Sequence, residues 1–202
     1  MFTAVPCNGL GGAVQSSTGY AKVQAVVRAA LAGNVTSGTV LLAPEVLARE
    51  GADLAERALI SLVPTERAMP TIRAREQWGM VLEAAVPILD SSGHVAGAVY
   101  GGILTNNRFD LVDRIRDTVF GDKTYQGRPV GTVTLFLDDV RVATNVTLDS
   151  GARAVGTRVS RAVYEKVLDR GQRFADRAFV VNDSCAIEIV SGLAAKVRGP
   201  IS

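Results

Sequence analysis

The sequence predicts an α+β fold with two antiparallel sheets, each flanked by helices. Three observations support this prediction. Two pairs of strand-like runs are each joined by a short turn, helix-like segments lie before, between and after these pairs, and 48% of the 202 residues are hydrophobic, enough for a sizeable core. Because strands joined by a hairpin pair antiparallel, helices are expected to cover one face of each sheet.

The chain begins with a Gly-, Ser- and Thr-rich segment over residues 1–20, which predicts an irregular lead-in. Residues 21–32 follow with apolar side chains at helical spacing, and Gly33 suits the end of that helix. A short strand is expected over 39–43. Further helices are expected from Pro44 and over 52–62.

The clearest signal is a β-hairpin that follows the polar loop 64–78. Residues 79–89 and 95–104 are apolar, strand-like runs, and Asp90-Ser91-Ser92-Gly93 between them is a turn sequence. A helix is expected next, over residues 107–120. Asn107 is expected to cap it by accepting a hydrogen bond from the Asp110 amide.

A second group of elements follows this helix. Strands are expected over 132–137 and 140–146, joined by Asp138-Asp139. Ser160 is expected to cap a helix that ends near Arg170, and residues 174–181 predict a further strand.

Composition excludes several classes of function. The net charge is +2, basic and acidic residues are interspersed, and only 5% of residues are aromatic, so a nucleic-acid-binding surface is not expected. Cys7 and Cys185 are far apart and form no metal-binding motif. The sequence has no apolar run of about 18 residues that would span a bilayer. Residues 1–12 lack the pattern of a signal peptide.

The sequence also offers few residues that could serve in catalysis. The single histidine, His94, follows a turn, and neither Gly-Gly pair has the spacing of a nucleotide-binding loop. Asp138-Asp139 could suggest a metal-binding pair, but two aspartates between strands are better explained as turn residues. The sequence therefore predicts no enzymatic activity, no metal and no cofactor.

A group of polar residues near the last strands is the candidate ligand site. It comprises Arg141, Thr144, Asn145, Arg158, Arg177 and Asp183. An arginine with hydroxyl and amide groups nearby suits a small polar or anionic ligand such as a carboxylate. Ordinary solvent-facing strand residues are the alternative. Strand alternation places Arg141 and Thr144 on opposite faces, so a bulge, or a ligand that approaches from the strand end, is needed to bring them together.

Several runs in this order resemble the Cache_3–Cache_2 fusion family, over roughly residues 25 to 183. The runs lie at 79–82, 90–93 and 100–104 for a first module, at 109–115 for a linking helix, and at 131–136, 141–146, 156–159 and 177–183 for a second module. This resemblance implies two PAS-like modules, over 21–106 and 121–183, joined by the helix 107–120. The tail 184–202 departs from the family pattern, which leaves the second module incomplete.

The resemblance also implies a function. Such domains lie outside the cytoplasmic membrane in bacterial sensor histidine kinases and chemoreceptors, bind a small molecule, and connect through membrane segments to cytoplasmic output domains. Residues 141–145 then lie on the strand that faces the ligand. Two alternatives stay open: a non-binding interaction or dimerisation module, and a cytosolic small-molecule enzyme. If the second module binds nothing, the site is expected in the first, around Glu83 and Tyr100. Whether the domain forms a homodimer is left open.

Overall fold

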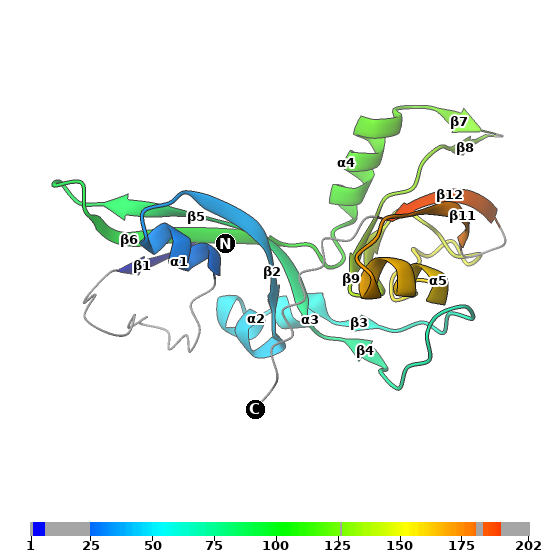
Figure 1. Cartoon of the computed structure of the whole chain (residues 1–202), viewed down its shortest axis with the longest axis horizontal. Coiled ribbons are helices and arrows are strands. Elements are labelled where there is room, and N and C mark those ends of the chain that lie inside the picture. The colour runs from blue at the N-terminus through cyan, green and yellow to red at the C-terminus, as the bar shows by residue number, and fades with distance from the viewer. Residues whose placement is uncertain (1, 7–24, 126, 181–183, 191–202) are drawn as a thin grey trace. The chain divides into compact units, whose positions relative to one another are not determined.

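The computed structural model describes residues 2–6, 25–125, 127–180 and 184–190, and it shows a mixed helix and antiparallel-strand fold (Figure 1). The chain forms two compact units, each made of two separate stretches. Unit 1 comprises Met1–Leu42 and Met80–Leu104, and unit 2 comprises Ala43–Gly79 and Thr105–Ser202. The stretch 43–79, which the sequence grouped with the first module, thus clusters with the later residues.

Unit 1 is built on a four-stranded sheet with the strand order β1-β6-β5-β2. Its elements are β1 (Phe2–Pro6), α1 (Ala25–Leu31), β2 (Thr36–Leu42), β5 (Gly79–Leu89) and β6 (Val95–Leu104). The β5–β6 hairpin has the bounds that the sequence predicts, because its turn is specified locally. The Asp90 carboxylate accepts hydrogen bonds from the amides of Ser92 (2.8 Å) and His94 (2.9 Å). Gly93 supplies the positive φ of +81°.

The two faces of this sheet differ. On one face, Val26, Val27 and Ala30 of α1 pack against three sheet residues, Ala85, Ala98 and Tyr100. The alternate residues of the hairpin are apolar as well, yet they remain 38–49% exposed among the described residues. They are Leu82, Val86, Ile88 and Ile103.

Unit 2 contains most of the short elements. They are α2 (Pro44–Glu50), α3 (Leu54–Ala58), β3 (Ile60–Ser61), β4 (Arg75–Glu76), α4 (Phe109–Phe120), β7 (Thr124–Tyr125), β8 (Arg128–Pro129), β9 (Thr134–Leu137), β10 (Val140–Thr144), α5 (Arg161–Val163), the π-helical segment η1 (Tyr164–Asp169), β11 (Phe174–Val180) and β12 (Ser184–Val190). The pairs β3–β4, β7–β8, β9–β10 and β11–β12 are all antiparallel.

Strand β10 has extended chain on both of its sides. Beyond its pairing with β9, the Arg141 amide donates to the Thr157 carbonyl (2.9 Å) and the Val159 amide donates to the Asp139 carbonyl (2.9 Å). Segment 63–68 borders the next edge, because the Val63 amide donates to the Gly156 carbonyl (2.9 Å) and Ala68 forms a bridge to Ser160. The sequence reading of 64–78 as a polar loop did not anticipate this pairing.

Two helix starts test the predicted caps. Ser160 caps α5 as predicted, since its hydroxyl accepts from the Val163 amide (3.4 Å). The Asn107 prediction is wrong, because α4 begins at Phe109 and its cap residue is Arg108, without a side-chain cap. Asn107 instead adopts a positive φ of +58° and donates its side-chain amide to the Arg57 carbonyl (3.0 Å).

The described part of the tail after Asp183 is a strand. Residues 184–190 form β12, which pairs with β11 along its whole length, from Val180↔Ser184 to Phe174↔Val190. Strand β11 therefore has an antiparallel partner strand in the tail 184–202, which departs from the pattern of the fusion family. Residues 191–202 lie outside the described residues.

Candidate functional site

The site begins with a β-bulge in β10. Val140 pairs with Leu137 and Arg141 with Phe136, but the next pair is Ala143 with Leu135, so Val142 is the extra residue. Thr144 then pairs with Thr134. Because Phe136 and Thr134 are two residues apart on β9, they lie on the same face, and so do their partners Arg141 and Thr144. Strand alternation predicted opposite faces for Arg141 and Thr144, and the bulge places them on the same face instead.

Arg141 is nearly buried on this face, with 6% of its surface exposed. Its Nη1 donates to the Thr157 hydroxyl (2.7 Å), which in turn donates to the Ala154 carbonyl (2.7 Å). The guanidinium carbon lies 5.2 Å from the centre of the Phe136 ring, in cation–π geometry. Arg141 is therefore a cation held in a fixed position inside unit 2.

Thr144 is fully buried beside it. Its hydroxyl is 2.7 Å from the Thr134 hydroxyl and accepts from the Val146 amide (3.1 Å). Asn145 has a different role in this structure. Its Oδ1 accepts from the Val133 amide (2.7 Å) and its Nδ2 donates to the Gly131 carbonyl (3.2 Å), so the side chain fixes the approach to β9.

Arg158 is buried in a polar network. Its Nε donates to Asp139 Oδ2 (2.6 Å) and its Nη1 donates to the Met69 carbonyl. Arg73 completes the network by donating to Asp139 Oδ1 (2.7 Å) and Glu76 Oε2 (3.0 Å). These contacts join segment 69–76 to the β9–β10 turn.

The sequence identified Asp138 and Asp139 only as turn residues. Asp138 fits that interpretation, with a positive φ of +55°, but Asp139 is 1% exposed and forms ion pairs with both Arg73 and Arg158. The one sequence feature that could have indicated burial is the position of Asp139, directly before the apolar strand that begins at Val140. Nothing in the sequence points to a partner 66 residues earlier.

Of the two remaining predicted residues, Arg177 lies on β11, where its backbone pairs with Ile187. Asp183 lies outside the described residues. The structure therefore brings Arg141 and Thr144 together on one face, places Asn145 and Arg158 in structural hydrogen bonds, and gives no side-chain placement for Arg177 or Asp183.

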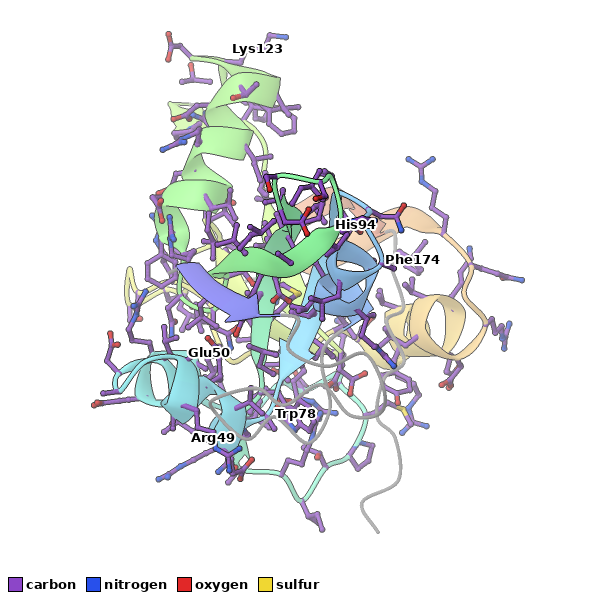
Figure 2. The ribbon with its side chains drawn as sticks, turned by 90° about the vertical axis from the view of Figure 1, so that its left-hand side faces the viewer. Arg49, Glu50, Trp78, His94, Lys123 and Phe174 are labelled. Atoms are coloured by element: carbon purple, nitrogen blue, oxygen red, sulfur yellow. The ribbon has the colours of Figure 1, made fainter. Side chains whose placement is uncertain are left out.

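Helix α5 and η1 supply the apolar part of the site. Val163 and Val167 pack with Val159 and Phe174 (Figure 2), and Phe136 of β9 lies against this cluster. Tyr164 packs there too, and burial raises the pKa of its phenol, helped by the carboxylates of Asp138, Asp169 and Asp139. The phenol therefore stays neutral at physiological pH.

The alternative site residues belong to unit 1. Glu83 and Tyr100 are 5% and 7% exposed, and Tyr100 packs in the core beneath α1. His94 is at the hairpin turn, with a side chain that is 83% exposed (Figure 2). Within the described ranges, no three His, Cys, Asp or Glu side chains are grouped so that they could bind a metal ion. No helix there is both long and apolar enough to cross a bilayer.

One family model matches part of the chain. Residues 103–189 match the family model described as single Cache domain 3. The match includes β9, β10 with its bulge, α5, β11 and β12 as far as Ile189. This similarity supports the predicted resemblance to Cache sensor domains over this stretch, and it does not extend to the fusion of two Cache modules. It also extends six residues beyond Asp183, where the resemblance to the fusion family ends.

Among solved structures, the chain is similar to the periplasmic domain of Vibrio cholerae LuxQ, with 16% sequence identity and a TM-score of 0.30. The similarity covers 66% of this chain and 52% of that one, so the chain spans about half of its length. No curated protein matches the chain.

Proposed function

We propose that this chain is the small-molecule-sensing part of a bacterial membrane receptor of the histidine kinase or chemoreceptor type. Its ligand is small and polar or anionic, most simply a carboxylate. The observation that carries the proposal is the β10 bulge, which turns Arg141 and Thr144 toward the same face. A guanidinium can grip a carboxylate through two parallel hydrogen bonds, and a neighbouring hydroxyl can orient it.

The burial of Arg141 supports this choice of ligand. An ionic hydrogen bond is stronger in an environment of low dielectric than in water, and the side chain is already ordered by Thr157 and Phe136. The ordering cost of binding is therefore small for this residue. Phe136, Val163 and Val167 provide apolar surface close to the same face.

We also propose that unit 1 is a second PAS-like module, as the resemblance to the fusion family implies. Its four-stranded sheet with α1 packed on one face supports this assignment. The family match, which begins at residue 103, covers only the last two residues of β6.

A thermal-shift screen with organic acids, amino acids and purines tests the proposed function. We expect one class of small carboxylates to raise Tm in a concentration-dependent way, because a ligand that binds only the folded state stabilises it. Calorimetry on the best compound then locates the site. Arg141→Ala should lose about 1.5–3 kcal/mol of binding free energy, the usual value for a hydrogen bond to a charged group.

Arg114→Ala, an exposed arginine on α4, is the matched control and should leave Kd unchanged. Because Arg141 is buried, Arg141→Lys serves as a second variant that keeps the charge and removes the planar fork. Unchanged affinity in Arg141→Lys, Arg141→Ala and Thr144→Val would overturn this site and direct the search to Glu83 and Tyr100.

A further inference from the structure

Two asparagines follow β6, where the chain returns from the hairpin to unit 2. Asn106 is 2% exposed, and its Nδ2 donates to two carbonyls, those of Ala58 (2.8 Å) and Trp78 (3.0 Å). Trp78 (Figure 2) directly precedes the first residue of β5. One side-chain amide therefore fastens three segments: the end of α3, the chain that enters the hairpin, and the chain that leaves it.

Asn107 links the same point to the candidate site. Its backbone amide donates to the carbonyl of Val142 (2.8 Å), and its side chain donates to the Arg57 carbonyl (3.0 Å). Val142 is the bulge residue, so its carbonyl has no place in the ladder with β9. The irregularity that turns Arg141 and Thr144 to one face thus also provides the acceptor for Asn107.

Asn106 and Asn107 contribute directional hydrogen bonds in addition to packing. Nδ2 of Asn106 donates to two carbonyls, and a buried carbonyl that loses its donor destabilises the folded state. Asn107 has a positive φ of +58°, a left-handed conformation that asparagine adopts more readily than most non-glycine residues. The pair connects the bulge to Trp78 through two hydrogen bonds and one peptide bond.

We propose that Asn106 and Asn107 are positioning residues that couple the Arg141–Thr144 face of β10 to the chain at Trp78 and Gly79, where the β5–β6 hairpin begins. A ligand that shifts the bulge moves the Val142 carbonyl, and with it the amide of Asn107 and the side chain of Asn106. The identification of this face as the sensing face rests on the proposed function. The coupling is a property of the folded chain and is testable without ligand.

Hydrogen exchange of the full chain, followed by mass spectrometry, tests the coupling. Asn106→Ala should accelerate exchange about tenfold in residues 59–62 and 75–80, the scale of one or two lost hydrogen bonds. The coupling predicts acceleration in residues 141–146 as well. Conversely, Thr144→Val should accelerate exchange in 75–80. Asn34→Ala, at an exposed asparagine of unit 1, should change none of these segments.

The double variant separates coupling from a merely structural role. Independent effects multiply, so a combined acceleration in 75–80 and 141–146 clearly below the product of the two single effects is the expected signature. If Asn106→Ala unfolds the chain, Asn107→Gly replaces it, since glycine accepts the positive φ and removes only the bond to Arg57. It should then accelerate exchange in both 57–62 and 141–146.

Effects of Asn106→Ala or Asn107→Gly that stay confined to residues 57–80, or of Thr144→Val confined to residues 130–147, overturn the coupling even if a carboxylate binds at Arg141. Conversely, if no compound in the thermal-shift screen raises Tm, the proposed function is contradicted, whereas the coupling measured by hydrogen exchange is unaffected.

Discussion

The described core of unit 1 is mainly apolar, whereas unit 2 also buries a charged network. In unit 1, small and aromatic side chains of the sheet meet the apolar face of α1. In unit 2, Asp139 and Glu76 are 1% and 3% exposed and are joined through Arg73, while Arg158 donates to the second carboxylate oxygen of Asp139.

This difference affects how each unit responds to mutation. Apolar packing depends on volume and pattern, and it tolerates exchange between side chains of similar size. A buried ion pair depends on each partner separately, because removing one partner leaves the other charge desolvated and uncompensated. Unit 2 should therefore contain the positions at which a single conservative change does most damage.

The largest effect is expected at Asp139. Replacement by Ala or Asn leaves the buried guanidinium of Arg158 without its carboxylate and should lower the free energy of unfolding by about 3–5 kcal/mol. Asp53→Ala removes an exposed i,i+4 pair with Arg57 and should cost about 0–1 kcal/mol. Urea denaturation of the three variants measures both values. A loss below about 1 kcal/mol at Asp139 would contradict the proposed difference between the units.

A second comparison uses two glycines with positive φ. Gly156 has a φ of +82°, and an added Cβ would overlap the Ser61 carbonyl oxygen, where segment 61–63 meets the sheet of unit 2. Gly156→Ala should therefore cost about 2–4 kcal/mol. Gly93 has a similar φ of +81° in the unit 1 hairpin but open space around it, so Gly93→Ala should cost only about 1–2 kcal/mol. Thermal melts of both variants test the order, and equal losses would show that φ alone matters.

The smallest effect concerns an exposed pair of unit 2. The bidentate hydrogen bond from Arg108 lowers the pKa of Asp110 to about 2. A depressed carboxyl pKa stabilises the folded state at pH values above the ordinary value of 3.8, and this contribution disappears as pH falls from there toward 2. In Arg108→Ala, an NMR titration should show the midpoint of Asp110 returning toward 3.8. A midpoint that stays near 2 would exclude Arg108 as the cause.

The sequence predictions were accurate where a feature depends on neighbouring residues, and they failed where it depends on residues far away in the chain. The hairpin 79–104 was predicted to its end residues, since alternation and an Asp-Ser-Ser-Gly turn lie within one short stretch. The Ser160 cap was confirmed for the same local reason. The start of α4 was misplaced by two residues, because the side chain of Asn107 bonds a carbonyl fifty residues earlier instead of the helix.

The candidate site was less predictable. Alternation alone showed that a bulge was needed to unite Arg141 and Thr144, and only the strand register identifies Val142 as the extra residue. The network of Asp139 was missed because its partners, Arg73 and Arg158, lie 66 and 19 residues away. The pairing of segment 63–68 was missed because Pro64 and the charged Glu66 and Arg67 are more typical of a loop than of a strand.

The hydrogen bond between Asn106 and Trp78 holds together the two points at which segments of the chain could be removed or inserted. The hairpin β5–β6 leaves unit 2 at Gly79 and returns at Thr105, and the two ends are held together by a contact of 3.0 Å between Asn106 Nδ2 and the Trp78 carbonyl. Such a pair of adjacent entry and exit points is where foreign segments are most easily spliced in or out. Because β5 and β6 are the two inner strands of the unit 1 sheet, a short turn in place of residues 80–104, combined with removal of residues 1–42, would take out unit 1 as a whole and leave the two stretches of unit 2 joined.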